Sequence, residues 1–189
     1  MNNNFEPQIK TIVEDLEKFL EQREFPINYC RNDLEEIIRL CAELTADYDE
    51  SHDINHHVNV FKNAVVIFEN ICSKKIIESL NFYVVMYASL LHDTVDYKYK
   101  NNLEQKKETL TKFLQRKLFY GWFTVDWIIN NISYTKEVIN GYPHHVNHTV
   151  EVLRDIISDA DKLDAIGQIG IDRCRQYNVL RYLIYMRSM

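Results

Sequence analysis

The chain of 189 residues contains only four glycines and three prolines, where an average globular sequence of this length carries about 23 of the two together. Because glycine supplies turns with positive φ and proline interrupts helices, this scarcity argues against sandwiches, barrels and hairpin-rich folds. The net charge of −6 disfavours non-specific contact with nucleic acid or an anionic membrane, and the length suits one domain with one core.

Apolar residues at three- and four-residue spacing predict helices in chain order, which we expect at residues 9–21, 34–44, 56–73, 82–91, 103–118, 125–132 and 149–173. Asn32 or Asp33 is the expected cap of the second helix. The helix over 82–91 is apolar on nearly every side and should be central and buried. We expect a loop over 135–147 and a break near 158–161. The prediction is an all-α domain of about seven to nine helices spanning residues 1–189.

Cysteine usage and the hydropathy pattern indicate a cytoplasmic protein. The four cysteines are far apart and form no Cys-x-x-Cys pair, which is typical of reduced thiols in a reducing compartment. No apolar run reaches the roughly 18 residues of a transmembrane helix, and the first residues lack the basic and apolar regions of a secretory signal.

Three polar positions stand out against this apolar background. His56 begins one predicted helix, His92 and Asp93 end the apolar helix, and Asp161 lies between two further aspartates at 159 and 164. Polar groups next to a core cost roughly 2–7 kcal/mol each when they have no partner, and a metal ion removes that cost by using them as ligands. Two histidines and two aspartates suit Mn, Fe, Zn, Ni or Co, with Mg also possible. A helix cap, a surface ion pair or a solvated helix start is the alternative interpretation.

These residues resemble a known signature. His56, His92-Asp93 and Asp161 match the H…HD…D order of the HD-domain metal-dependent phosphohydrolases. The resemblance covers residues 51–173 and is most specific over 159–170, where the sequence is similar to small HD hydrolases that include nucleotide pyrophosphohydrolases. It implies an HD-type helical bundle and one divalent metal, first of all Mn, held by those four residues, with His57 as a rival for the first position.

The resemblance also suggests roles for other residues. Asp96 or Asp159 is expected to orient the attacking water or act as a general base. Lys98 and Lys162, expected in loops beside the ligands, are candidate phosphate contacts, with solvated surface lysines as the alternative. Asn59 stands where the family usually has an arginine, so substrate affinity or choice can differ here.

The expected activity is hydrolysis of a nucleotide or another small phosphorylated metabolite, first of all of a nucleoside triphosphate to monophosphate and pyrophosphate. A phosphomonoesterase, a phosphodiesterase and a non-catalytic nucleotide sensor remain open. We expect no nucleic-acid or membrane partner, and a homodimer is conceivable because relatives are often dimers.

Further residues near the matched segments allow weaker expectations, for Tyr97, Tyr99, Tyr134, His144, His145, His148, Gly167 and Gly170. One of the tyrosines could stack on a nucleobase. The two glycines, three residues apart, should allow close approach of another helix. The three histidines follow Gly-Tyr-Pro and could bind a second metal, but the His-His-Glu of the cyclic-dinucleotide phosphodiesterases is missing, so we expect a polar rim of the active site instead.

Overall fold

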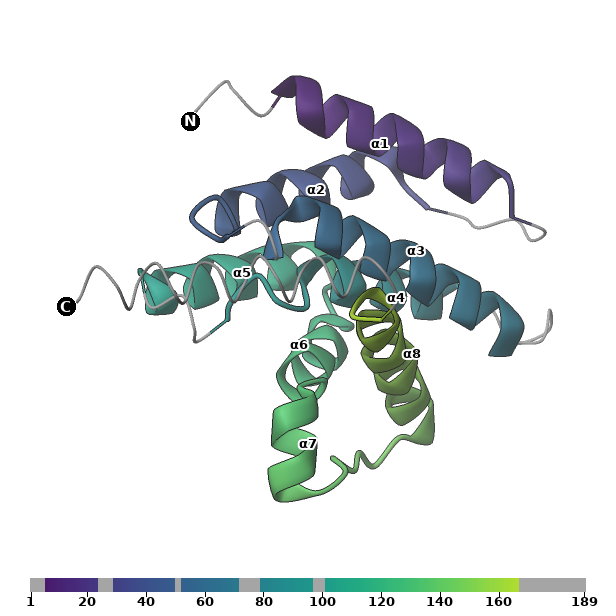
Figure 1. Cartoon of the computed structure of the whole chain (residues 1–189), viewed down its shortest axis with the longest axis vertical. Helices are drawn as coiled ribbons and strands as arrows, with labels where there is room; N and C mark the ends of the chain where they lie inside the picture. Colours follow the sequence, from purple (N-terminus) through teal and green to yellow (C-terminus); the bar gives the residue numbers. More distant parts are fainter. Residues whose placement is uncertain (1–5, 24–28, 50–51, 72–78, 97–100, 167–189) are drawn as a thin grey trace.

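The computed structural model describes residues 6–23, 29–49, 52–71, 79–96 and 101–166. Within these residues it contains eight α-helices and no β-strand, so the predicted all-α bundle is confirmed. The helices, shown in Figure 1, are α1 (Glu6–Glu21), α2 (Arg31–Leu44), α3 (Ile54–Ile71), α4 (Ser79–Leu91), α5 (Leu103–Lys117), α6 (Trp122–Asn131), α7 (Tyr134–Asn140) and α8 (His148–Asp164).

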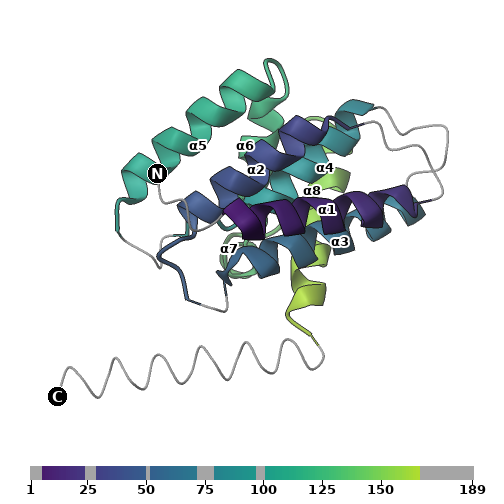
Figure 2. The ribbon, with the colours of Figure 1, turned by 90° about the horizontal axis from the view of Figure 1, so that it is seen from above.

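Helix α4 is the centre of the bundle. Every side chain from Val84 to Leu91 is buried, and the helix packs against α2, α3, α6 and α8. Figure 2 shows it enclosed by these neighbours. The Phe82 ring lies 6.4 Å, between centroids, from Phe61 and from Phe68 of α3. The sequence predicts this burial because α4 has no polar face.

Helix α3 makes its most extensive contacts with α8 and α4. The Asn63 side chain on α3 donates a hydrogen bond to the Ala160 carbonyl oxygen on α8 over 3.3 Å. On the other side of the bundle, α1 contacts α2 and α3 with Ile9, Val13, Leu16 and Leu20. Because α3 packs against both α4 and α8, the start of α3, the end of α4 and the end of α8 meet at one place.

A helix cap and a helix break that the sequence predicts are absent from the structure. Helix α2 begins at Arg31 after an extended Cys30, so the prediction of a cap at Asn32 or Asp33 is wrong. Asp33 instead lies in the first turn, where its negative charge interacts favourably with the helix dipole. The predicted break near 158–161 is also wrong, because α8 is continuous to Asp164. Its polar residues are divided between faces, with Ser158 buried and Asp159 exposed.

The predicted loop over 135–147 is wrong in its first half, which forms α7. This helix has seven residues and buries none of them, so it has no apolar periodicity from which to predict it. Its start is marked by Ser133, whose hydroxyl accepts a hydrogen bond from the Lys136 backbone N–H over 3.5 Å.

None of the described helices is long and apolar enough to cross a bilayer. Of the cysteines, Cys30 is exposed and Cys41 is buried, and burial raises the pKa of the Cys41 thiol. The remaining sequence expectations at Cys72, Cys174, Tyr97, Tyr99, Lys98, Gly167 and Gly170 lie outside the described residues.

Candidate metal centre

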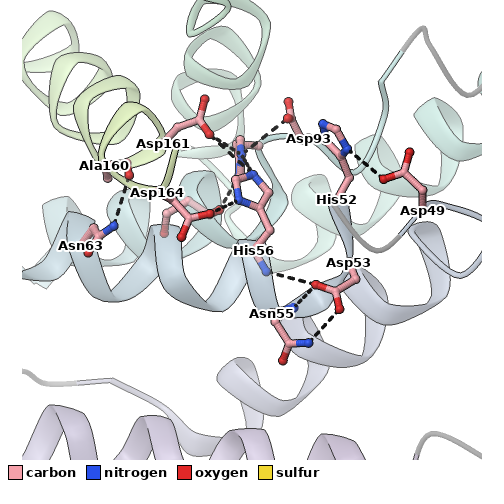
Figure 3. A network of polar contacts seen from close by, with 12 residues as sticks. Asp49, His52, Asp53, Asn55, His56, Asn63, Asp93, Ala160, Asp161 and Asp164 are labelled. Atoms are coloured by element: carbon pink, nitrogen blue, oxygen red, sulfur yellow. Dashed lines mark hydrogen bonds and ion pairs between the residues drawn. The ribbon is translucent and has the colours of Figure 1, made fainter. Parts of the chain in front are cut away.

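Four side chains expected to bind a metal come together where the three helices meet. His56 lies in the first turn of α3, His92 and Asp93 follow the end of α4, and Asp161 is in the last turn of α8. The Nε2 atoms of His56 and His92 are 3.1 Å apart. Asp161 Oδ1 lies 3.5 Å from the first and 3.7 Å from the second, and Asp93 Oδ2 lies 3.7 Å from His92 Nε2. Figure 3 shows His56, Asp93 and Asp161 directed toward one another.

The other nitrogen of each ring determines what faces the centre. His92 Nδ1 lies 2.8 Å from the Ser89 carbonyl oxygen, which can only accept a hydrogen bond, so Nδ1 carries the proton. His56 Nδ1 is 2.7 Å from an Asp164 carboxylate oxygen, which likewise accepts. In the neutral rings both Nε2 atoms therefore turn a lone pair toward the same point. Two such lone pairs at this separation, beside two carboxylates, favour a positive charge between them, either a proton on one ring or a metal ion.

The electrostatics of His92 show how strongly the centre attracts positive charge. Burial of the ring lowers its pKa, but the carboxylates of Asp93 and Asp161 outweigh that effect and raise the pKa of His92 to about 9. A metal ion competes with this proton, because a histidine ligand must be neutral. His56, His92 and Asp93 thus form a group that could hold a divalent metal, because each offers a ligand atom and these atoms lie within 4.8 Å of one another.

Asp164 is a site residue that the sequence reasoning missed. It is buried, with 5% of its surface exposed, and its hydrogen bond fixes both the tautomer and the orientation of His56. The signal was its position three residues after Asp161, because residues at that spacing share one face of a helix.

His57, the rival first ligand, lies in the core beside the centre. Its ring is fully buried, and its centroid is 4.9 Å from that of His92. The Nε2 atom that reaches His92 belongs to His56. Asn59 lies partly exposed on α3.

The other sequence candidates occupy different surroundings. Asp96 is buried, with 8% exposure, and lines the cavity beside the centre. The Asp159 side chain is 64% exposed and lies 3.7 Å from the Lys162 ammonium group. Both of these residues are on α8, so the expectation that Lys162 lies in a loop is wrong.

A cavity of about 380 Å³ opens beside these candidate ligands. His92, Asp93, Asp96 and Asp161 line one side of it. The opposite side comes from α5, α6 and the start of α7, and its polar residues are Lys107, Thr111, Asp126, Asn130, Ser133, Tyr134, Thr135 and Lys136. Tyr134 was a candidate from the sequence, whereas the residues that α5 and α6 contribute were missed because they belong to no recognisable motif.

Arg154 joins the cavity wall to the helix that carries Asp161. It is 1% exposed on α8. Its guanidinium group donates to the Asn131 carbonyl oxygen over 2.8 Å, to Asp155 over 2.9 Å and to Glu137 on α7 over 2.6 Å. Charge-assisted hydrogen bonds of this kind are the stronger ones in proteins, so α7 is held in place although it buries no side chain.

The histidines after Gly-Tyr-Pro do not line this cavity, contrary to expectation. They gather around Glu151, which accepts hydrogen bonds from the His145 backbone N–H at 2.9 Å and contacts the rings of His144 and His148. Because α8 is unbroken, the 13 steps along the helix from His148 to Asp161 separate them by about 20 Å at 1.5 Å per residue. These histidines therefore cannot bind the same ion as Asp161.

Glu151 gives a testable pH dependence. The His145 backbone N–H, followed by the His148 ring, lowers the pKa of Glu151 from 4.5 to about 2. Because the pKa of Glu151 is lower in the folded than in the unfolded state, its ionised form stabilises the fold. This stabilisation is complete above the unfolded-state pKa and is lost as the pH falls through the folded-state pKa. We expect a stability difference between wild type and Glu151→Gln that is present above pH 4.5 and closes toward pH 2, measured by urea unfolding. A difference that does not change with pH would contradict this role.

The comparisons with known proteins place the fold but not the activity. No protein-family model matches the sequence. An uncharacterized protein from Acanthamoeba polyphaga mimivirus is 27% identical over 146 residues, which cover 72% of this chain and 58% of that protein. A crystal structure of a protein from Lactobacillus plantarum superimposes with a TM-score of 0.59 at 21% identity, covering 79% of this chain and 64% of that one. The chain thus spans about three fifths of each relative's length, and the likeness to the crystal structure shows a shared fold.

Proposed function

We propose that this protein is a metal-dependent phosphohydrolase of the HD-domain type that acts on a nucleotide or a similar small phosphorylated metabolite. The observation that carries the proposal is the pair of inward-facing Nε2 atoms of His56 and His92, flanked by Asp93 and Asp161 and open to a cavity. The order of these residues along the chain is that of the H…HD…D signature.

The donor set fits a divalent transition metal. Two imidazole nitrogens with two carboxylates suit Mn, Fe, Ni, Co or Zn, and Mg less well. When bound, such an ion lowers the pKa of a coordinated water and neutralises charge on the phosphoryl group. The second ring nitrogens, held by Ser89 and Asp164, keep both histidines in the tautomer that this role requires.

The residues of the cavity supply the remaining functions. Asp96 is preferred to Asp159 as the group that orients the attacking water, because it is buried beside Asp93 and lines the cavity. Lys107 and Lys136 are placed to bind phosphate oxygens from the opposite wall. They take the role that the sequence suggested for Lys162. The cavity volume of about 380 Å³ is in the range of small-ligand sites.

The specific reaction that we propose is hydrolysis of a nucleoside triphosphate between its α- and β-phosphates. A water oxygen attacks the α-phosphorus, the bond from that phosphorus to the bridging oxygen breaks, and pyrophosphate leaves. The proton of the water passes to Asp96. The products are a nucleoside monophosphate and pyrophosphate.

A panel assay tests the proposal. Purified protein is incubated with nucleoside mono-, di- and triphosphates and cyclic nucleotides in the presence of Mn, Mg, Co or Ni, and the products are separated by anion-exchange chromatography. Pyrophosphate release supports the proposed reaction, orthophosphate release supports a phosphomonoesterase, and ring opening supports a phosphodiesterase. Binding with no product under any metal supports a nucleotide sensor and contradicts the hydrolase.

The two cavity lysines give a second test. Lys107→Ala and Lys136→Ala should each raise KM for a triphosphate about tenfold, because one charge-assisted hydrogen bond is worth about 1.5–3 kcal/mol. Lys112→Ala is the matched control, since this exposed lysine on α5 pairs with Glu108. An unchanged KM in both cavity variants would exclude them as phosphate contacts.

A further inference from the structure

The cavity wall opposite the candidate ligands contains a single carboxylate among the described residues, that of Asp126. Asp126 lies on α6, and Asn130 lines the same cavity one turn further along this helix. Residues at this spacing share one helix face. The Asn130 side-chain amide donates a hydrogen bond to the Asp126 backbone carbonyl oxygen over 2.8 Å. The two polar residues therefore form one patch on the cavity surface.

Asp126 has no cationic partner in the described part of the chain. Burial raises the pKa of its carboxyl group, and a hydrogen bond from Asn130 opposes that effect. Both lysines of this wall contact other groups. Lys107 Nζ lies 3.1 Å from Glu104 Oε1, and Lys136 Nζ donates to the Asn130 carbonyl oxygen over 3.3 Å. A partly buried carboxylate of this kind is stabilised when a ligand donates hydrogen bonds to it.

A carboxylate on this wall restricts which part of a nucleotide can lie beside it. It repels phosphate groups, and when ionised it only accepts hydrogen bonds. Leu110, Ile129 and Ile132 line the same cavity and suit the carbon faces of a base or a sugar. The two carboxylate oxygens can accept from two adjacent donors, which a nucleoside offers in the ribose 2′,3′-diol or in the N1–H and 2-amino groups of guanine. An inorganic polyphosphate offers no such pair.

We propose that Asp126 determines specificity for a nucleoside, by accepting two hydrogen bonds from adjacent donors of the sugar or the base. The phosphates then lie between the metal centre and the cavity lysines, away from the Asp126 charge. A site built to accept hydrogen bonds discriminates against ligands that lack the donors, because its own polar atoms are then left unpaired. This inference rests on the proposed function, since it assumes that a phosphorylated nucleoside occupies the cavity.

The test measures binding without turnover, by isothermal titration calorimetry in the presence of Mn²⁺. The ligands are inorganic tripolyphosphate and the triphosphates of guanosine, inosine and 2′,3′-dideoxyguanosine, each with CH₂ in place of the oxygen between the α- and β-phosphorus. Asp126→Asn should weaken binding of the guanosine compound about 10- to 100-fold, because it loses hydrogen bonds to a charged group. It should not weaken binding of tripolyphosphate, since it removes a negative charge from the cavity.

The wild type identifies which donors Asp126 contacts. Weaker binding of the inosine compound, which lacks the 2-amino group, assigns the contact to the base. Weaker binding of the dideoxy compound assigns it to the ribose. In Asp126→Asn the corresponding preference should decrease, because the two changes remove the same interaction.

Glu108→Gln is the matched control, since this carboxylate on α5 is exposed and pairs with Lys112, and it should bind all four ligands as the wild type does. The proposal is overturned if the wild type prefers guanosine over neither analogue. It is also overturned if Asp126→Asn leaves guanosine binding unchanged or weakens tripolyphosphate binding equally. Selective binding without hydrolysis would contradict only the proposed function, and hydrolysis without selectivity only the role of Asp126.

Discussion

Asp93→Asn should remove tight metal binding and lower kcat/KM for a nucleoside triphosphate by at least about 10³-fold. The substitution keeps the size of the side chain but removes the charge that lies 3.7 Å from His92 Nε2. A metal ion contributes several kcal/mol of transition-state stabilisation, and each 1.36 kcal/mol corresponds to a tenfold change in rate. Metal content by elemental analysis and initial rates with Mn²⁺ measure the two effects.

The control for this variant is Asp15→Asn, a carboxylate on α1 whose side chain is 60% exposed. It should match the wild type in metal content and rate. Asp93→Asn should remain folded, because the Asp93 side chain is one third exposed and its removal relieves repulsion with Asp161. An Asp93→Asn protein that retains its metal and its activity would contradict the assignment of this ligand.

Asp164→Asn should weaken metal binding by about 10- to 100-fold, the usual cost of losing a partner that orients a ligand. The carboxylate accepts a hydrogen bond from the Nδ1–H of His56 over 2.7 Å. An amide in its place can donate its own N–H to Nδ1, which moves the ring proton to Nε2, where the metal would bind. Competition with a chelator of known affinity measures the change in Kd for Mn²⁺.

Asp164 is a positioning residue, and two further observations separate this role from a purely structural one. Saturating Mn²⁺ should restore most of kcat in Asp164→Asn. The effects of Asp164→Asn and His56→Gln on Kd should be non-additive, because both act through the same ligand atom. An unchanged Kd, or fully additive effects, would show that Asp164 does not act through His56.

The sequence predicts the fold and the first ligands for a specific physical reason. Helix α4 is apolar on nearly every side, so the sequence predicts that His92 and Asp93 at its end lie beside the core and need partners. The spacing of apolar residues gives α1, α3 and α5 directly. Helix α7 has no such pattern because it buries nothing, and its position depends on distant bonds from Arg154.

The residues that α5 and α6 contribute to the cavity could not be predicted from the sequence, because their position also depends on packing between distant helices. Lys107 and Lys136 line the same cavity as Asp93 only because of the packing of α5, α6 and the start of α7. Local patterns do not encode this packing. The role of Asp164, in contrast, follows from its spacing of three residues from Asp161 on one helix. His52, in contrast, is brought within 4.8 Å of Asp93 only by the fold.

The central claim is tested most directly by following a nucleoside triphosphate incubated with Mn²⁺-loaded wild-type protein and, in parallel, with Asp93→Asn. The account predicts nucleoside monophosphate and pyrophosphate in equal amounts from the wild type, a reaction stopped by chelator, and no more than about a thousandth of that rate from the variant. No product with any of Mn, Mg, Co or Ni, or equal product from wild type and Asp93→Asn, would contradict it.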